Sequence, residues 1–458
     1  MCGIFGVWGH QQAPELTHLG LYSLQHRGQE SAGVVAVADG GAAAVREMGL
    51  VSERLADRIQ AMHGHAAIGH TRYSTAGSST LENAQPILAR SRGGHIALAH
   101  NGNLINATEL RAELEERGSI FASTMDSEVI VHRIARSTAP TPGERLAEAL
   151  AGVEGAYCLV VLVDGALVAA RDPRGWRPLV IGTLGEATIV ASETCALDIV
   201  GATLVREVEP GEIVTIDGAG IRSSSPFAPL PLKRCIFEHV YFARPDSWIF
   251  GGSVDRARRA LGRRLAREHP APGAELVFSV PDSSNSAALG FAEESGLPFE
   301  LALIRNHYVG RTFIQPTQAG RDAKVKVKYN AVREILEGRS VVMVDDSIVR
   351  GTTTRGLVAM VRGAGAREVH MRVSSHPVTG PCYYGIDTPS REELIAANLS
   401  IDEIAAHLGV DSLGYLSLDG MLEAVPTGPH GFCHACFSGD YPTPPPTDPD
   451  KLRFGCGC

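Results

Sequence analysis

The segment Val341–Thr354, with the sequence VVMVDDSIVRGTTT, constrains the fold of this chain more than any other stretch. Its apolar start is typical of a strand that is buried on both faces of a parallel sheet. Leu276–Val280 is a second run of this kind, and strand–loop–helix alternation surrounds both runs. The second half of the chain is therefore predicted to be an α/β domain built on a parallel sheet.

The first half of the chain has a different texture, with short β-type runs and two or three helical patterns, which predicts a layered α+β domain. The clearest helix is expected over Thr108–Arg117, with Gly118 at its end. Ser223–Leu232 contains three prolines and is interpreted as a linker. The expected strands are Gly3–Trp8, Val34–Val37, Ala66–Gly69, Ile96–Ala99, Tyr157–Val163, Thr188–Ala191 and Glu212–Ile216.

Composition narrows the class of protein. The 458 residues are 44% hydrophobic and 20% charged, which is typical of an enzyme of two or three domains and excludes a fibrous or mostly disordered chain. The formal net charge of −9 argues against nucleic acid as a partner. No segment approaches the ~20 apolar residues of a membrane span, and the N-terminus has no signal-peptide pattern. We therefore expect a cytoplasmic protein. Its nine scattered cysteines do not fit a disulfide scaffold, and in a reducing compartment cysteines more often serve metal binding or catalysis.

Cys2 directly follows the initiator methionine, and a small second residue normally permits removal of that methionine. Cys2 would then carry a thiol and a free α-amino group, whose pKa of about 7.7–8.0 suits a base near neutral pH. One residue could thus supply both nucleophile and base. The alternative is a buried structural cysteine in a strand.

Four polar motifs support the catalytic interpretation. HRGQESAG (His26–Gly33) and HTRYSTAG (His70–Gly77) each place one arginine among small residues. HNGNL (His100–Leu104) offers an amide side chain and a glycine N–H, the donors that an oxyanion hole requires. STMDSE (Ser123–Glu128) offers a carboxylate at a strand-to-helix turn. An arginine and an aspartate could together bind a free amino acid, although each motif alone could be turn chemistry.

These motifs, in this order after MCGIFG, resemble the class II glutamine amidotransferases, which have the N-terminal-nucleophile hydrolase fold. The resemblance covers most of residues 2–230 and implies an αββα sandwich that hydrolyses glutamine to glutamate and ammonia. It also implies that Arg27 lies near the nucleophile.

The resemblance assigns roles to the residues that carry the motifs. Cys2 is expected to form a γ-glutamyl thioester, with the Asn101 side chain and the Gly102 N–H stabilising the tetrahedral oxyanion. Arg72 is expected to bind the α-carboxylate of glutamine, and Asp126 its α-ammonium group.

The Val341–Thr354 segment has its own chemistry. Asp345 and Asp346 stand at the C-terminal end of the predicted strand, where open α/β sheets bind ligands. The following loop supplies backbone N–H groups, Gly351 and three hydroxyls at a helix start, which suits a phosphate group. Together they suit a sugar phosphate, with or without Mg²⁺, and the segment is not a Walker A loop. An acidic turn with a threonine-rich helix cap is the structural alternative.

This segment resembles the signature of type I phosphoribosyltransferases. The resemblance implies that Asp345 and Asp346 hold the ribose hydroxyls or one Mg²⁺ per subunit. Ser279–Ala288 resembles the pyrophosphate loop of that family, with Ser283 as a candidate magnesium ligand. The residues expected to bind phosphoribosyl diphosphate are Asp345, Asp346, Gly351, Thr352, Thr353 and Thr354.

Two further segments, Arg305–Pro316 and Arg321–Lys328, look like the mobile flap of these transferases. Lys324, Lys326 and Lys328 are three of only five lysines in the chain, which suggests phosphate contact. A solvated charge run is the alternative.

The two halves together resemble the amidophosphoribosyltransferase family. That resemblance implies that ammonia released at Cys2 passes internally and displaces pyrophosphate from phosphoribosyl diphosphate. The product would be 5-phosphoribosylamine, in the first committed step of purine synthesis. It also implies a homotetramer or homodimer and inhibition by purine nucleotides. A non-catalytic phosphoribosyl-diphosphate sensor is the rival, but the intact Cys2 motifs and the lack of a basic DNA-binding segment argue against it.

Four other cysteines form a candidate metal site. Cys433 and Cys436 form a C-x₂-C pair, and Cys235 and Cys382 are distant in sequence, so spacing alone leaves zinc and iron–sulfur open. Their sequence contexts resemble the iron–sulfur branch of the family, which implies one [4Fe–4S] cluster per subunit. The second domain is then expected over residues 231–440, followed by a proline-rich tail over 441–458.

The remaining cysteines receive no role in this scheme. Cys158 and Cys195 lie in or beside strand-like segments and are expected to be packing residues. Cys456 and Cys458, in the tail, have no counterpart in the family.

Overall fold

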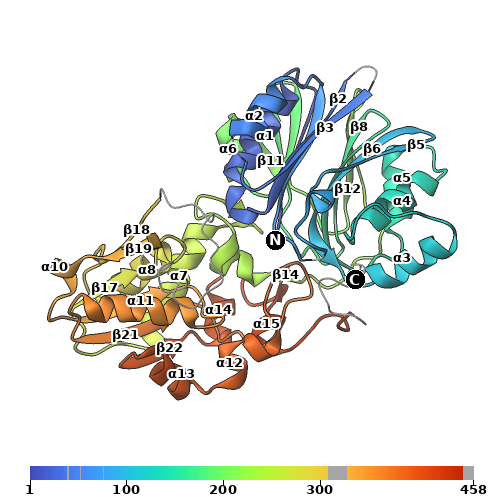
Figure 1. The fold of residues 1–458 in the computed structure, drawn as a ribbon. Helices are drawn as coiled ribbons and strands as arrows, with labels where there is room; N and C mark the ends of the chain where they lie inside the picture. Colours follow the sequence, from blue (N-terminus) through green and yellow to red (C-terminus); the bar gives the residue numbers. More distant parts are fainter. Residues whose placement is uncertain (39–40, 52, 76, 308–326, 447–458) are drawn as a thin grey trace.

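A computed structural model describes residues 1–38, 41–51, 53–75, 77–307 and 327–446. Two units are visible in Figure 1, and the N-terminus lies where they meet. The larger part of the expected flap, residues 308–326, and residues 447–458 of the tail with Cys456 and Cys458 lie outside the described residues.

The first unit is built on two stacked antiparallel sheets, a seven-stranded one in the order β11-β9-β10-β1-β4-β2-β3 and a six-stranded one in the order β13-β12-β8-β7-β6-β5. Apolar side chains from both sheets, among them Ile4, Ile68 and Val160, form one buried cluster. The strands are β1 (Gly3–Trp8), β2 (Ser31–Ala38), β3 (Gly41–Met48), β4 (Ala66–Arg72), β5 (Ile87–Ser91), β6 (Gly94–Leu104), β7 (Gly155–Val163), β8 (Ala166–Arg171), β9 (Val180–Leu184), β10 (Ala187–Ala191), β11 (Thr203–Glu207), β12 (Ile213–Asp217) and β13 (Gly220–Ser224).

Helices cover the outer faces of both sheets, which completes four αββα layers (Figure 1). Buried clusters beneath the helices hold them in place, as where Leu21 packs with Phe5 and where Leu146 packs with Val161. The expected N-terminal-nucleophile hydrolase sandwich is confirmed. The helices are α1 (Ala13–Ser23), α2 (Glu53–Gln60) and α6 (Cys195–Val200) on one side, and α3 (Ala107–Glu116), α4 (Glu128–Arg136) and α5 (Pro142–Leu150) on the other.

The second unit is built on a four-stranded parallel sheet in the order β17-β20-β21-β22, as the apolar runs predicted. One buried cluster covers each face, because the strands alternate Val277 and Val342 on one side with Phe278 and Met343 on the other. The strands are β17 (Leu276–Ser279), β20 (Ser340–Asp345), β21 (Glu368–Val373) and β22 (Ser412–Tyr415), and the longest helices are α7 (Val254–Glu268), α8 (Asn285–Ser295), α11 (Thr352–Gly363) and α13 (Ile401–Leu408).

Shorter elements complete the described chain. The parallel pair of β14 (Arg234–Cys235) and β23 (Phe432–Cys433) joins the start of the second unit to its end. The others are η1 (Gln25–Arg27), η2 (Leu81–Asn83), the π-helix η3 (Glu238–Phe242), η4 (Arg391–Glu393), β15 (Trp248–Ile249), β16 (Gly252–Ser253), β18 (Leu303–Arg305), β19 (Tyr329–Ala331), α10 (Arg333–Leu336), α12 (Ile395–Asn398), α14 (Leu418–Glu423) and α15 (Ala435–Ser438).

Two local expectations differ from the structure. The strand expected over Ile96–Ala99 does not end before the HNGNL motif but runs through it as the end of β6, because residues 100–104 continue the pairing with β7. The turn that carries Asp126 precedes α4 as expected, but a loop after α3 leads into it rather than a strand. Within the described residues, no helix has the length and apolar character that a membrane crossing needs.

Candidate active site

Cys2 lies at the open end of β1, next to the end of β4. Gly3 pairs with Thr71 in the sheet, so Cys2 and Arg72 reach the same edge. The Cys2 side chain is buried, and its Sγ lies 3.6 Å from the Tyr73 carbonyl oxygen. Its backbone N–H donates to Asn101 Oδ1 at 3.2 Å, which ties the nucleophile strand to β6 across the two sheets.

Asn101 and Gly102 have the features of an oxyanion site. Asn101 is fully buried, and its Nδ2 has no hydrogen-bond partner among the described residues, so this donor is available beside Cys2. A buried donor without a partner is costly to a fold unless something else uses it. Gly102 has to be glycine, because a Cβ there would stand 1.9 Å from the Ala156 carbonyl oxygen.

Arg72 and Asp126 bring opposite charges to this edge, and both are almost fully buried. Burial lowers the pKa of Arg72, and Cys2, Glu30 and Asp126 act against that shift. The Asp126 carboxylate accepts the Leu104 N–H at 2.8 Å, which fixes its orientation. Of the residues predicted from separate motifs, Asn101 therefore contacts Cys2 directly, and Arg72 interacts electrostatically with both Cys2 and Asp126.

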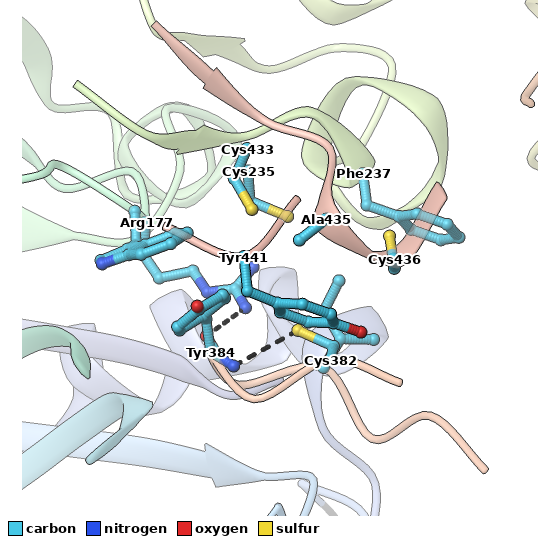
Figure 2. A pocket seen from close by; sticks show the side chains of 11 residues that line it. Arg177, Cys235, Phe237, Cys382, Tyr384, Cys433, Ala435, Cys436 and Tyr441 are labelled. Atoms are coloured by element: carbon cyan, nitrogen blue, oxygen red, sulfur yellow. Dashed lines mark hydrogen bonds between the residues drawn. The ribbon is translucent and has the colours of Figure 1, made fainter. Parts of the chain in front are cut away.

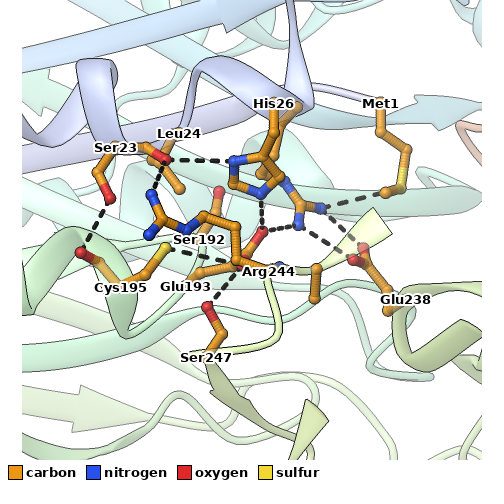
Figure 3. A network of polar contacts seen from close by, with 12 residues as sticks. Met1, Ser23, Leu24, His26, Ser192, Glu193, Cys195, Glu238, Arg244 and Ser247 are labelled. Carbon is orange, nitrogen blue, oxygen red and sulfur yellow. Dashed lines mark hydrogen bonds and ion pairs between the residues drawn. The ribbon is translucent and has the colours of Figure 1, made fainter. Parts of the chain in front are cut away.

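Arg27 also lies at the nucleophile, as expected. Its Nε donates to the Cys2 carbonyl at 2.9 Å, and its two terminal nitrogens donate to Glu238 at 3.0 and 2.8 Å. It also pairs with Glu193, which accepts from Ser247 and contacts His26 (Figure 3). Burial lowers the pKa of Arg27, but Glu238 and Glu193 more than offset it, so the side chain stays charged.

Sequence reasoning missed Glu193 and Glu238. Both are completely buried, and Glu238 belongs to the second unit, so the network in Figure 3 crosses between the units. A carboxylate within an otherwise apolar and aromatic run, as in CIFEHVYF, was the one signal that could have indicated Glu238.

The second candidate centre is the edge of the parallel sheet where β20 ends. Asp345 and Asp346 are both buried, and Ser283 and Ser284 reach them from the loop after β17. Ser283 Oγ donates to Asp346 Oδ2 at 2.6 Å, and Ser284 Oγ donates to Asp345 Oδ1 at 3.1 Å. Burial and the neighbouring Asp346 charge raise the pKa of Asp345. Two adjacent buried carboxylates that share the Ser284 hydroxyl favour a bound cation or further hydroxyl donors.

The loop after the acids leads into α11 as predicted. Gly351 precedes the helix with φ +75°, and a Cβ there would stand 2.7 Å from the Ile395 Cδ1. Thr352 and Thr353 are exposed in the first turn, whereas Thr354 is buried. The helix start therefore presents free N–H groups and hydroxyls beside the acids.

Arg258, on α7, was not predicted from the sequence. It is buried and donates from Nε to the His239 carbonyl at 2.8 Å and from Nη2 to the Ala243 carbonyl at 2.7 Å. Its positive charge acts to lower the pKa of Asp346, although burial keeps that pKa raised. It therefore links the η3 helix electrostatically to the acid pair.

The four predicted metal-site cysteines line one pocket, together with Trp176, Arg177 and Tyr384 (Figure 2). Cys235 and Cys433 are paired residues of β14 and β23, and none of the four forms a disulfide. Burial raises the pKa of Cys235 to about 11. Among the described residues, no three His, Cys, Asp or Glu side chains are close enough to hold a single metal ion.

Comparisons with known proteins agree with the class that this geometry defines. Residues 70–198 match the glutamine amidotransferase domain family. Amidophosphoribosyltransferase from Bacillus subtilis (strain 168) is 50% identical over 448 residues, which is 96% of this chain and 94% of that protein. The protein of that name from Archaeoglobus fulgidus is 47% identical, covering 97% of this chain and 99% of its own.

Two solved structures share the whole fold. One is described as the allosteric regulatory enzyme of purine biosynthesis, with a TM-score of 0.93, 49% identity and 98% of each chain covered. The other is glutamine phosphoribosylpyrophosphate amidotransferase from B. subtilis complexed with ADP and GMP, with a TM-score of 0.91, 49% identity, and 97% of this chain and 98% of that chain covered.

A nucleophile sandwich joined to a parallel sheet with an acid pair defines a glutamine-dependent phosphoribosyltransferase. The chain belongs to the amidophosphoribosyltransferase family. It is a glycosyltransferase with glutaminase activity that forms 5-phosphoribosylamine in purine biosynthesis. The alternative of a non-catalytic sensor is set aside, because the relatives are enzymes.

Proposed function

We propose that residues 2–230 hold the glutaminase centre, residues 231–440 hold the transferase centre, and residues 441–458 form a tail. The observation that carries the glutaminase assignment is the buried Asn101 amide, which accepts from the Cys2 N–H and keeps an unpartnered Nδ2 beside it.

In the proposed glutaminase reaction, removal of Met1 leaves the α-amino group of Cys2 to take the thiol proton. The thiolate attacks the carboxamide carbon of glutamine, and the oxyanion accepts from Asn101 Nδ2 and the Gly102 N–H. Arg72 and Asp126 hold the two charged ends of the amino acid. The α-ammonium group returns its proton to the amide nitrogen, so that the C–N bond breaks and ammonia leaves, and water then hydrolyses the thioester to glutamate.

In the proposed transfer reaction, Asp345 and Asp346 accept hydrogen bonds from the ribose hydroxyls. The N–H groups and hydroxyls of Gly351, Thr352, Thr353 and Thr354 hold the 5-phosphate. Ammonia attacks C1 and the bond to pyrophosphate breaks. Ser283, Asp345 and Asp346 would hold Mg²⁺, which neutralises charge on pyrophosphate when bound. Their oxygen ligands and the raised pKa of Asp345 fit such a cation.

We also propose a [4Fe–4S] cluster on Cys235, Cys382, Cys433 and Cys436. Support comes from four free thiols that line one pocket. The spacing of the four cysteines leaves zinc and iron–sulfur open, and the resemblance of their sequence contexts to the iron–sulfur branch of the family favours the cluster. Four cysteine ligands would make it structural, because no position stays open for substrate.

Purine nucleotides are proposed as inhibitors, and a homotetramer or homodimer as the assembly. The support is the family membership and the relative that was solved in complex with ADP and GMP.

The Cys2→Ala variant tests the glutaminase assignment. We expect loss of glutamine-dependent synthesis, with synthesis from added ammonia retained, because the transferase centre needs only an amine. Cys158→Ala, at another buried cysteine that lies in β7, is the matched control and should retain both activities. Wild-type glutamine use by Cys2→Ala would refute the assignment.

A further inference from the structure

A loop of the second unit, residues Cys382–Gly385, touches the strand that carries the proposed oxyanion donors. Asn103, one residue after Gly102 on β6, donates from Nδ2 to the Tyr383 carbonyl at 2.9 Å. Gly385 packs directly on the Gly102 backbone. The two contacts bring a segment of the second unit against the two residues that follow Asn101.

The contact between the two glycines leaves no room for a side chain. A Cβ on Gly385 would stand 2.9 Å from the Gly102 carbonyl carbon and 3.1 Å from its carbonyl oxygen. Gly385 also has φ +103°, a backbone conformation that other residues rarely adopt. A change at either glycine is therefore transmitted to the other backbone.

The loop itself is firmly held. Arg177 Nη2 donates to the Tyr384 carbonyl at 2.6 Å, and the Tyr384 ring stacks on Trp176 with ring centroids 4.0 Å apart. Tyr384 and Trp176 are both almost fully buried. At the start of the loop, the Tyr384 N–H donates to Cys382 Sγ at 3.4 Å (Figure 2). A rigid loop can fix the position of what it touches.

We propose that the Cys382–Gly385 loop positions the oxyanion donors of the glutaminase centre, with Gly385 and Asn103 as positioning residues. The inference rests on the proposed oxyanion role of Asn101 and Gly102. The donors belong to the first unit, but their alignment depends on a segment of the second unit. Glutamine hydrolysis is therefore expected to need these contacts for its full rate.

Gly385→Ala tests the proposal in the full-length holoenzyme. An error of about 1 Å in a catalytic group can cost on the order of 100-fold in rate, and loss of one oxyanion donor costs as much or more. We expect kcat for glutamine hydrolysis to fall at least about 10-fold, with KM for glutamine within about twofold, because Arg72 and Asp126 are not displaced. Synthesis from ammonia should be unchanged.

A second measurement, the alkylation rate of Cys2, distinguishes a displaced oxyanion donor from a general loss of structure at the glutaminase centre. Alkylation of Cys2 by iodoacetamide needs the thiolate but no oxyanion donor, so its rate should match the wild type. Gly220→Ala is the matched control, because Gly220 has φ +102° and open space around it. Gly220→Ala puts an alanine into a similar left-handed backbone conformation far from the oxyanion donors, and it should leave kcat for glutamine hydrolysis unchanged.

Asn103→Asp is the second variant, in case Gly385→Ala folds poorly. It keeps the size of the side chain but replaces the N–H donor with an oxygen, so the contact to Tyr383 becomes repulsive. Asn101→Ala, run in parallel, tests the proposed function itself. If Asn101→Ala hydrolyses glutamine normally, the oxyanion assignment is wrong.

If Asn101→Ala loses activity while Asn103→Asp and Gly385→Ala keep the wild-type kcat, only the positioning proposal is overturned. Slower alkylation of Cys2, or a parallel loss of ammonia-dependent synthesis in both variants, would also overturn it in favour of general disruption.

Discussion

At the scale of single residues, the acid pair at the end of β20 shows a conflict between binding and folding. Asp345 and Asp346 are adjacent, buried and negatively charged, with Ser283 and Ser284 as their hydrogen-bond donors. Burial and mutual repulsion raise the pKa of Asp345 and so disfavour its charged form. The pair costs stability in the free protein and becomes favourable when ligands supply donors or positive charge.

Asp345→Asn should therefore stabilise the free protein and inactivate it. Asparagine can still accept the hydrogen bonds from Ser284 and the Asp346 N–H but carries no charge. We expect the free energy of unfolding at pH 7 to rise, because burial and the neighbouring Asp346 penalise the charged form of Asp345. Synthesis from ammonia should be lost, while glutamine hydrolysis changes much less.

The gain in the free energy of unfolding from Asp345→Asn should depend on pH, and the raised pKa of Asp345 fixes the direction of that dependence. Because folding raises the pKa of Asp345, its carboxylate destabilises the folded protein fully at any pH above the folded-state pKa. Below the pKa of the unfolded chain, about 3.9, the carboxyl is protonated in both states and this destabilisation is absent. The advantage of Asp345→Asn in denaturant unfolding should thus shrink as the pH falls through this window. Asp57→Asn, at an exposed carboxylate, is the control, and an equal gain there would contradict the explanation.

At the scale of elements, the sequence predicted strands best where burial leaves a pattern. Gly3–Trp8 was predicted to the residue as β1, and the run Val341–Val344 lies within β20. The prediction missed β13 because every one of its residues is exposed, so its side chains show no alternation between apolar and polar. Its existence depends on pairing with β12, a contact between strands rather than a property of either one.

The residues of the candidate sites also fall into those that the sequence predicted and those that it did not. Arg72, Asn101 and Asp345 stand in short motifs that carry their own chemistry, so local sequence sufficed to predict them. Glu193 and Glu238 could not be paired with Arg27 from the sequence, because 166 and 211 residues separate them and only the fold brings them together.

The start of α11 offers a test at the element scale. Gly351→Ala would force a Cβ into Ile395 while the residue holds φ +75°. Because a left-handed conformation costs a non-glycine residue about 1–2 kcal/mol, we expect the loop to shift and the proposed phosphate site to distort. KM for phosphoribosyl diphosphate in the ammonia-dependent reaction should rise about 10-fold or more, which corresponds to roughly 1.4 kcal/mol of binding.

Gly409→Ala is the matched control for this prediction. Gly409 ends α13 with the same φ of +75° but has open space around it. It should show the loss of stability without the change in KM. An unchanged KM in Gly351→Ala would mean that this helix start does not hold the phosphate.

At the scale of the whole molecule, the proposed cluster would tie together three distant parts of the second unit. Protein purified without oxygen should contain about four iron atoms per chain, the content of one [4Fe–4S] cluster. Removal of iron should speed hydrogen exchange in β14 and β23, because the ligands Cys235 and Cys433 face each other there. A colourless, active protein with one zinc ion would show that the metal was wrongly assigned.

The buried ion pairs of Figure 3 join the two units more directly. Arg27 and Arg177 from the first unit both contact Glu238 from the second, and all three side chains are fully buried. Replacing one partner of such a group leaves an uncompensated buried charge, at a cost of about 3–5 kcal/mol. The same type of pair at the surface, Arg350 with Glu393, is about half exposed and screened by water, so it should contribute little to stability.

Glu238→Gln should therefore destabilise the protein by about 3 kcal/mol or more in denaturant unfolding, whereas Glu393→Gln should leave the stability almost unchanged. Because Arg27 Nε also holds the Cys2 carbonyl, kcat for glutamine should fall further than synthesis from ammonia in the folded fraction. The double variant Glu238→Gln with Arg177→Met removes one buried positive charge along with the negative one and should recover part of the lost stability. If the double variant is less stable than the two single losses together predict, Glu238 does not act by balancing these two arginines.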